Sequence, residues 1–218
     1  MYKIFYRSSV NPVILIVSKC FAEELHQEET MDHKGTATLE TPRLILRRFT
    51  VEDAEAVYKN WASDERVTKY LTWLAHANTE VSREYMRWCV SGYEQSNFYQ
   101  WGIVLKESGE PVGNISVVRL DEETDSAEIG YVLGHAFWGN GYMTEALVRV
   151  IGFLFDEAGA KRVCARHDVE NLRSGRVMQK AGMHYEGTLR QSGRNSRGIV
   201  DLAVYSILES EYNNTNIQ

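Results

Sequence analysis

One stretch of this sequence constrains its fold more than any other: a strand-like segment, a glycine-bearing turn and a long amphipathic helix follow one another directly. Residues 128–133 form the strand candidate, the turn reads Trp138-Gly139-Asn140-Gly141-Tyr142, and Gly159 marks the end of the helix. The helix carries an apolar stripe of Leu147, Val150, Ile151, Leu154 and Phe155. This order places free backbone N–H groups and the positive end of a helix dipole together, which favours phosphate binding.

The turn differs from two familiar phosphate-binding loops. No Gly-Lys-Ser/Thr follows it, as a Walker loop requires, and it lacks the third glycine and the later acidic residue of a dinucleotide fingerprint. Glycines at 139 and 141 allow close backbone approach without a Cβ clash. Most Gly-x-Gly pairs are ordinary turns. The motif alone is therefore consistent with either an ordinary turn or a phosphate-binding site.

The rest of the chain alternates strand and helix patterns, without repeats or low-complexity linkers. The patterns predict strands at 44–48, 101–105, 111–119, 127–133, 162–166, 184–189 and 200–208. They predict helices at 50–61, from 78 or 79 onward, from the glycine turn to Gly159, and at 171–180. The predicted fold class is α/β in the broad sense: a mixed, strongly twisted, mostly antiparallel sheet flanked by helices.

A single domain is expected, because 218 residues with 44% hydrophobic content suit one compact core. We place this domain at residues 41–212, followed by a polar tail at 213–218. Residues 1–40 form an atypical extension, whose apolar run at 13–17 is too short to span a bilayer and precedes no signal-peptide cleavage site. The codons of Gln27-Glu28-Glu29 can resemble a bacterial ribosome-binding site, so a translation start at Met31 is a second interpretation of this extension.

The cysteine and charge patterns exclude several classes of protein. Cys20, Cys89 and Cys164 have no CxxC spacing and no nearby histidine pair, so we expect no disulfide framework, no metal site and a reducing, cytoplasmic location. A net charge of −6 argues against stable nucleic-acid binding, and we expect no membrane association. Between Lys161 and Arg197, nine basic residues stand against three acidic ones, which suits either a small polyanionic ligand or a solvated surface.

A second motif follows the long helix. It consists of Asn171-Leu172-Arg173-Ser174 and then Val177-Met178-Gln179-Lys180-Ala181-Gly182-Met183. Together with Tyr142-Met143-Thr144-Glu145-Ala146 after the glycine turn, it resembles the GNAT acetyltransferases, and within them the branch of the ribosomal-protein N-terminal acetyltransferases. The resemblance runs from Thr41-Pro42-Arg43-Leu44 to about Glu211. Trp138 is common in this branch, whereas Met143 departs mildly from the glycine or alanine that is usual in the family.

The resemblance implies acetyl-coenzyme A as the cosubstrate and assigns residues to its parts. Pyrophosphate would be held by the backbone N–H groups of Gly139, Asn140, Gly141, Tyr142, Met143 and Thr144. The pantetheine arm would pair with the strand end at Tyr131, Val132 and Leu133, and Asn171 would hydrogen-bond that arm from the other side. The adenosine phosphates would meet Arg173, Arg176 or Lys180, among which the sequence does not choose.

The resemblance also implies direct attack of a primary amine on the thioester. Glu128 is the candidate base, because strand alternation puts it on the face of Gly130 and Val132; a surface glutamate in a strand pair is the alternative. Many family members protonate the thiolate with a tyrosine at the position of Met178, and methionine cannot do this. Ser174 is therefore the candidate hydrogen-bond donor to the sulfur, and it can cap the helix start at the same time.

The residue types leave the amine acceptor open. An α-amino group with a pKa of about 8 is roughly one-tenth neutral at pH 7, whereas a lysine amine near 10.4 is neutral in about one part in several thousand. The N-terminal amine of a protein therefore needs only a weak base and is the favoured acceptor. A small-molecule amine, a non-catalytic acyl-CoA sensor and a ribosome- or nucleic-acid-associated module are the alternatives.

Three further expectations concern the surroundings of the site. The family places Tyr70, Trp73 and residues 190–201 at the mouth of the cleft, where they would form the walls of the acceptor pocket. His167 follows a strand, so a role in the site is one interpretation, but a solvated loop residue is the one we expect. The protein is expected to be a monomer or a homodimer.

Overall fold

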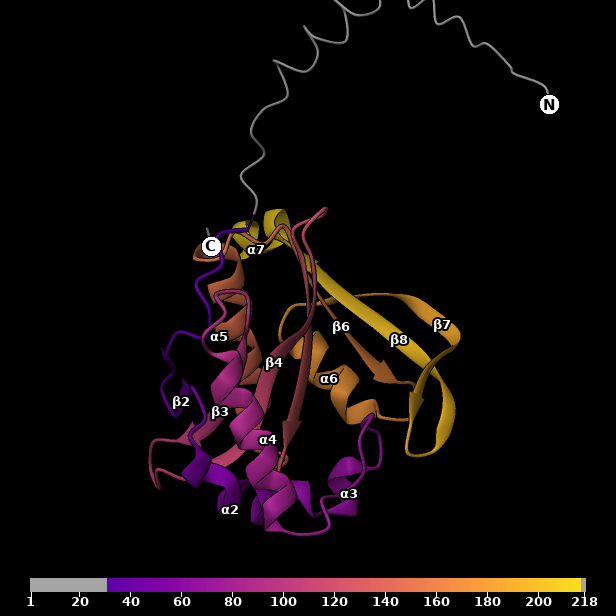
Figure 1. Ribbon diagram of the computed structural model, residues 1–218. Coiled ribbons are helices and arrows are strands. Elements are labelled where there is room, and N and C mark those ends of the chain that lie inside the picture. The colour runs from indigo at the N-terminus through magenta and orange to yellow at the C-terminus, as the bar shows by residue number, and fades with distance from the viewer. Residues whose placement is uncertain (1–30, 217–218) are drawn as a thin grey trace, which may run out of the picture. The chain divides into compact units, whose positions relative to one another are not determined.

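The computed structural model describes residues 31–216, which are built around one twisted sheet (Figure 1). The strands lie side by side in the order β1 (Leu39–Glu40), β2 (Leu44–Arg47), β3 (Gln100–Leu105), β4 (Pro111–Asp121), β5 (Ser126–Leu133), β6 (Arg162–Asp168), β8 (Gly198–Leu208) and β7 (His184–Asn195). Neighbouring strands are antiparallel except for β5 and β6, which are parallel. The predicted mixed, mostly antiparallel sheet is confirmed.

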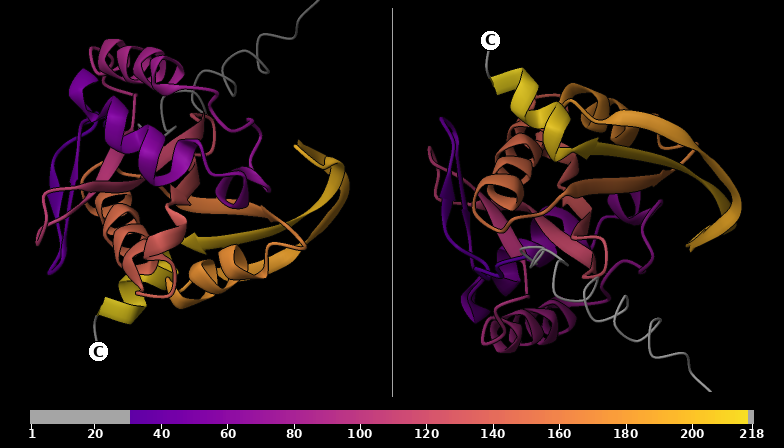
Figure 2. Two further views of the ribbon diagram at one scale, coloured as in Figure 1. Left: turned by 90° about the horizontal axis from the view of Figure 1, so that it is seen from below. Right: turned by 90° about the horizontal axis from the view of Figure 1, so that it is seen from above.

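Helices cover both faces of the sheet (Figure 2). One face carries α5 (Tyr142–Asp156) and α6 (Leu172–Lys180), and the other carries α2 (Ala54–Val57), α3 (Glu65–Thr68) and α4 (Thr79–Gly92). α2 is the middle of a continuous helical run that also includes the turns at Val51–Asp53 and Tyr58–Ala62. A short turn at His135–Phe137 precedes the glycine turn, and α7 (Glu209–Asn216) follows β8. None of the helices within residues 31–216 is long and apolar enough to cross a membrane.

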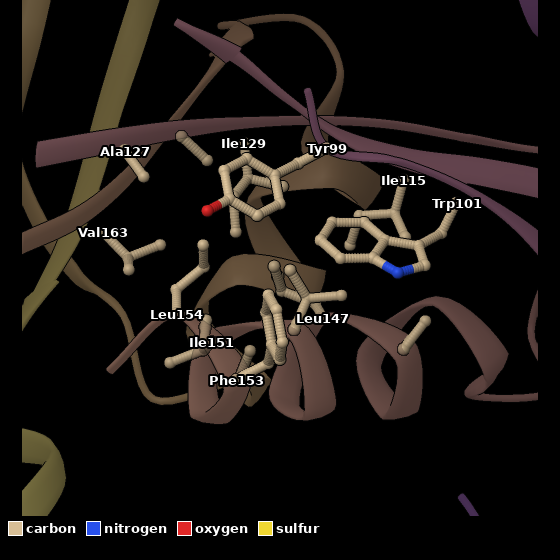
Figure 3. Packing of buried hydrophobic residues seen from close by; sticks show 14 of the residues in the cluster. Tyr99, Trp101, Ile115, Ala127, Ile129, Leu147, Ile151, Phe153, Leu154 and Val163 are labelled. Atoms are coloured by element: carbon tan, nitrogen blue, oxygen red, sulfur yellow. The ribbon is translucent and has the colours of Figure 1, made fainter. Parts of the chain in front are cut away.

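The larger core lies between α5 and the sheet (Figure 3). The five residues of the predicted apolar stripe are all buried there, and Leu147 is fully buried. Phe153 of the same helix meets Trp101 of β3 edge to face, with ring centroids 5.7 Å apart. Burying each such side chain contributes roughly 1.5–3 kcal/mol, so this face fixes α5 firmly against the sheet. The start of α5 is therefore held in place by the rest of the helix.

The packed unit begins at Met31, within the segment that the sequence analysis counted as an extension. Contacts divide the chain into residues 1–30 and a unit that starts at Met31. Met31 and Leu39 are buried in the main core, and the Met31 backbone N–H donates to Asp125 Oδ1 at 3.0 Å. The apolar run at 13–17, the segment Gln27-Glu28-Glu29, Cys20 and the last two residues of the polar tail lie outside the described residues.

The C-terminal hairpin is longer than its pattern predicts. β7 and β8 were expected at 184–189 and 200–208, yet they continue to Asn195 and from Gly198. Register shifts between Tyr185 and Gly187 and between Leu189 and Gly193 interrupt the alternation of side chains, which is why the pattern hid the continuation. The extended tip reaches the site described below.

The parallel pair β5 and β6 separates partway along its length. Pairing runs from Ser126 opposite Arg162 to Ile129 opposite Ala165, whereas residues 130–133 of β5 pair with β4 alone. β6 meanwhile remains paired with β8 as far as Asp168. The two strands thus form a wedge that opens toward their C-terminal ends, and α6 begins beyond it.

Candidate active site

A pocket of about 1070 Å³ lies at this wedge. Its wall comes from four segments: residues 66–71, the end of β5, the glycine turn with the start of α5, and residues 170–180. The pocket brings together most of the residues singled out in the sequence, namely Tyr131, Val132, Leu133, Gly139, Gly141, Tyr142, Met143, Thr144, Asn171, Ser174, Arg176 and Lys180. Glu128 and Asn140 lie outside the lining, and so do Trp73 and residues 190–201, which were expected to form walls of the acceptor pocket.

The glycine turn presents backbone N–H groups at the start of α5. Gly141 is the N-cap of the helix, with φ +79°, and no side chain caps the helix there; Gly139 has φ +85°. The first helical hydrogen bond runs from the Glu145 N–H to the Gly141 carbonyl, at 3.0 Å. The N–H groups of Tyr142, Met143 and Thr144 therefore precede the first bonded turn, which is the arrangement that accepts an anion at a helix start.

A clamp from the N-terminal part of the domain holds this turn. Glu145 Oε1 accepts from the Thr41 hydroxyl at 2.6 Å and from the Arg43 N–H at 3.0 Å, and Glu145 Oε2 accepts from Arg43 Nε at 2.7 Å. Arg43 Nη1 also donates to the Asn140 carbonyl at 2.9 Å, and its guanidinium lies 4.6 Å from the centre of the Tyr142 ring. The sequence analysis named Thr41, Arg43 and Glu145 only as parts of motifs and did not predict these hydrogen bonds.

Hydrogen bonding keeps the Glu145 carboxylate ionised. Burial opposes ionisation, but hydrogen bonds from Thr41 and Arg43 outweigh it, so the pKa of Glu145 lies below its ordinary value of 4.5. The positive end of the helix dipole also stabilises a carboxylate in the first turn. Asn140 contributes through its backbone carbonyl, and its side-chain amide donates to the Phe137 carbonyl at 3.2 Å. Its role in the structure is to shape the turn.

The opposite wall is the start of α6. Asn171 is its N-cap, and its side chain accepts from the Ser174 N–H at 3.4 Å. Ser174 Oγ lies 2.9 Å from Tyr131 Oη, which also donates to the Ser174 carbonyl at 3.0 Å. Met178, at the position where many related enzymes carry a tyrosine, is buried in the core and does not line the pocket. Ser174 is thus the hydroxyl of α6 that reaches the pocket.

The basic zone of the sequence separates into two groups. Arg162 pairs with Glu186, Arg166 with Glu128, and Arg197 with Asp168 and Glu170. In contrast, Arg173, Arg176 and Lys180 lie along the pocket wall on α6. The guanidinium of Arg173 lies 5.0 Å from the centre of the Trp138 ring, whose Nε1 donates to the Leu133 carbonyl at 2.7 Å. Within the basic zone, the cations of α6 are therefore the ones that a polyanion in the pocket can meet.

Glu128, the candidate base, lies at the narrow end of the wedge. Its Oε2 is ion-paired with Arg166 of β6, just past the last pairing of β5 with β6. The hydrogen bond to Glu128 raises the pKa of Arg166. Because Glu128 does not line the pocket, contact with a bound amine would require a bridging water. Within the described residues, no three His, Cys, Asp or Glu side chains are grouped to hold a metal ion.

The expectation that His167 is a solvated loop residue was wrong. His167 lies on β6 and is only 9% exposed, stacked on Tyr205 with ring centroids 5.7 Å apart. Its Nδ1 donates to the Asp168 carbonyl at 2.7 Å, while its Nε2 has no hydrogen-bond partner among the described residues. Nε2 points at Gly175 of α6, where a Cβ would lie 2.7 Å away. The sequence hid this because β6 continues two residues beyond the predicted strand.

Two distant segments meet at the end of the pocket formed by residues 66–71. Ser196 Oγ at the tip of the β7–β8 hairpin donates to the Lys69 carbonyl at 2.7 Å. The Tyr70 ring lies between two cations, 5.0 Å from Lys69 Nζ and 5.5 Å from the Arg197 guanidinium. Tyr70 lines the pocket as expected, whereas Trp73 does not and packs against His76 at 5.3 Å.

Comparisons with known proteins complete this description. The family model described as "Acetyltransferase (GNAT) domain" matches residues 43–184. The chain is 30% identical over 175 residues to an uncharacterized N-acetyltransferase, p20, of Bacillus licheniformis, covering 80% of this chain and 98% of that one. It is 29% identical to a putative ribosomal N-acetyltransferase, YdaF, of Bacillus subtilis, covering 79% of this chain and 92% of that one. A solved GNAT-family acetyltransferase from Bacillus anthracis matches with a TM-score of 0.70 and 28% identity, covering 80% of this chain and 99% of that one.

Proposed function

Because the chain belongs to the GNAT acetyltransferase family and is therefore an N-acetyltransferase, we propose that it moves the acetyl group of acetyl-coenzyme A to the N-terminal α-amine of a protein. One observation carries the use of acetyl-coenzyme A. The glycine turn, the open edge of β5 and the cationic face of α6 line a single pocket. These three features suit the pyrophosphate, the pantetheine arm and the adenosine phosphates respectively.

The turn would bind the pyrophosphate through backbone N–H groups. Glycine at 139 and 141 permits the left-handed backbone there, and the N–H groups of residues 142–144 lie at the positive end of α5. Along the wedge, residues 131–133 would pair with the pantetheine arm as a further strand would. Asn171 Oδ1 is engaged in capping α6, which leaves its amide nitrogen to donate to that arm.

The reaction proposed is direct attack of a neutral amine on the thioester. A carbon–nitrogen bond forms, the carbon–sulfur bond breaks, and its electron pair leaves on the sulfur. Glu128 would take the amine proton through a bridging water, using the Oε1 that Arg166 does not hold. Ser174 would donate a hydrogen bond to the thiolate, which then takes its proton from solvent.

The α-amine assignment rests on the weakness of this base. A water-relayed carboxylate already paired with arginine suits an amine that is about one-tenth neutral at pH 7 far better than a lysine side chain. The similarity to YdaF, a putative ribosomal N-acetyltransferase, supports a protein acceptor.

Acetyl-coenzyme A turnover tests the proposal. The full chain would be incubated with acetyl-coenzyme A and one of two matched peptides. The first peptide has a free N-terminus and an arginine in place of its lysine. The second peptide has a blocked N-terminus and keeps its single lysine. Release of coenzyme A and the mass gain of each peptide would be followed. We expect acetylation of the free N-terminus and little of the blocked peptide.

The other outcomes each select a different function. Preference for the lysine peptide, or for amino acids and polyamines over both peptides, would overturn the α-amine acceptor. Binding of acetyl-coenzyme A without turnover on any amine would instead support an acyl-CoA sensor and refute catalysis.

A further inference from the structure

We propose that Tyr131 is a positioning residue that aims the Ser174 hydroxyl at the leaving sulfur. The inference rests on the proposed function, in which Ser174 stabilises the departing thiolate. It assigns to the Tyr131 side chain a task separate from that of its backbone, which faces the pantetheine arm in the proposal above.

The two residues meet inside the pocket from opposite walls. Tyr131 lies on β5 and Ser174 in the first turn of α6, and both line the pocket. Tyr131 Oη lies 2.9 Å from Ser174 Oγ and 3.0 Å from the Ser174 carbonyl oxygen. These contacts join the two elements that flank the wedge, so the phenol fixes the position of the serine relative to β5.

Counting hydrogens shows that Tyr131 also controls the direction of the serine hydroxyl. Each hydroxyl has one hydrogen. If Tyr131 donates to the Ser174 carbonyl, the serine hydrogen is drawn toward Tyr131 Oη and none remains for the sulfur. If Tyr131 donates to Ser174 Oγ, the serine hydrogen is available to the sulfur.

The negative charge that develops on the sulfur selects the second arrangement. A hydrogen bond to a charged acceptor is stronger than one to a neutral acceptor. The pair is therefore a short relay, phenol to serine to thiolate. Its orientation changes as the carbon–sulfur bond breaks, while no heavy atom has to move.

Tyr131 acts in this relay through hydrogen bonds and does not supply the proton. Burial raises the pKa of Tyr131 above its ordinary value of 10. A thiol has a pKa of about 8.5, so transfer of the phenol proton to the thiolate would be uphill. The thiolate is stabilised where it forms and is protonated later by solvent.

The test compares Tyr131→Phe with Tyr205→Phe. Both variants remove one hydroxyl and keep the ring, and the Tyr205 hydroxyl also meets α6, through Gln179 Nε2 at 3.3 Å, but lies outside the pocket lining. We expect Tyr131→Phe to lower kcat about tenfold, with KM for acetyl-coenzyme A within about twofold. Tyr205→Phe should leave both constants within about twofold.

A double variant separates positioning from general weakening of the fold. Since Tyr131 acts through Ser174, the kcat of Tyr131→Phe with Ser174→Ala should equal that of Ser174→Ala alone. In Ser174→Thr, which keeps a hydroxyl, the loss caused by Tyr131→Phe should persist. The proposal would be overturned if the loss of kcat in the double variant equalled the product of the two single losses. It would also be overturned if Tyr131→Phe and Tyr205→Phe lost kcat equally.

A binding measurement keeps the proposal testable without any acceptor. The thiol of bound coenzyme A would be titrated by its ultraviolet absorbance. In the wild type its pKa should be lower than in Tyr131→Phe by about one unit, corresponding to a tenfold change in the thiolate equilibrium. If the wild type acetylates no amine but this difference appears, the proposed function fails and the role of Tyr131 stands. Equal thiol pKa values in the two proteins would refute that role.

Discussion

The two ends of the pocket are built by different means. At the end where we propose that the cofactor binds, the groups offered to it are backbone N–H groups of a helix start, and Glu145 ties that start to Thr41 and Arg43. At the end where we propose that the acceptor binds, Lys69 and Tyr70 line the pocket, and the hairpin tip is attached to them by the bond from Ser196 to the Lys69 carbonyl. The first surface belongs to a long packed helix, and the second belongs to connecting segments.

This difference follows what each end has to bind. A cofactor that is the same in every turnover can be held by backbone geometry, which side-chain substitutions scarcely alter. An acceptor that differs between related enzymes is better met by exchangeable side chains on loops carried by a rigid scaffold. Substitutions at the cofactor end should therefore affect cosubstrate binding, and those at the acceptor end should affect acceptor use alone.

The largest effect is expected from Gly141→Glu. Its left-handed φ of +79° is unfavourable for any other residue, and a carboxylate there would repel the pyrophosphate. We expect kcat/KM for acetyl-coenzyme A to fall about 100-fold or more. Gly109→Glu is the matched control, since Gly109 has φ +70° and an open surrounding in the β3–β4 turn, away from the pocket. Similar losses in both variants would show that backbone strain, and not the site, is responsible.

Arg43→Ala should have the next largest effect. It removes the side-chain donors to Glu145 and to the Asn140 carbonyl, while the Thr41 hydroxyl and the backbone N–H of residue 43 still donate to Glu145, so the clamp is weakened and the sequence of the turn stays intact. Calorimetry should show acetyl-coenzyme A binding about tenfold more weakly, because charge-assisted hydrogen bonds are worth about 1.5–3 kcal/mol. Lys106→Ala, which breaks the exposed ion pair with Glu40, should change affinity less than twofold. Unchanged affinity in Arg43→Ala would mean that the turn keeps its shape unaided.

Acid should loosen the cofactor end through Glu145. Its folded-state pKa lies below 4.5, so its contribution to the free energy of unfolding is complete above about pH 4.5 and is lost as the pH falls through the lowered value. Thermal unfolding of the wild type and Glu145→Gln should therefore differ most at neutral pH and converge in acid. A stability difference that stays constant below pH 4.5 would contradict the clamp as an ionised contact.

The smallest effect is expected at the acceptor end, from Ser196→Ala. Removing the bond to the Lys69 carbonyl frees the hairpin tip, and KM for the acceptor should rise about two- to fivefold, in keeping with one lost neutral hydrogen bond. Affinity for acetyl-coenzyme A should stay unchanged. Ser192→Ala is the control, because Ser192 lies on the same hairpin and its hydroxyl donates to the nearby Leu189 carbonyl at 3.1 Å. A shift in acetyl-coenzyme A affinity would remove the distinction between the two ends.

The same contrast explains what the sequence could predict. The glycine turn and the apolar stripe of α5 are local patterns, and each lies where it was expected. Ser174 was expected to cap the start of α6, but the side chain of Asn171 does so and the Ser174 hydroxyl contacts Tyr131 instead. Glu145 joins residues about a hundred positions away, and Ser196 meets Lys69 across 127 positions, so no periodicity records either contact. His167 was misplaced because β6 extends past its apolar pattern, and its surroundings are set by the missing side chain of Gly175.

Binding of cosubstrate fragments tests the central claim, that the turn at the start of α5 holds the pyrophosphate, most directly. Wild-type protein would be titrated calorimetrically with acetyl-coenzyme A, with its dephospho form, which keeps the pyrophosphate, and with acetyl-pantetheine, which lacks it. We predict micromolar binding of acetyl-coenzyme A, about tenfold weaker binding of the dephospho form, and a further loss of about 100-fold or more for acetyl-pantetheine. Equal affinity for the dephospho form and acetyl-pantetheine would contradict the account, because contacts between the turn and the pyrophosphate would then contribute nothing to the affinity.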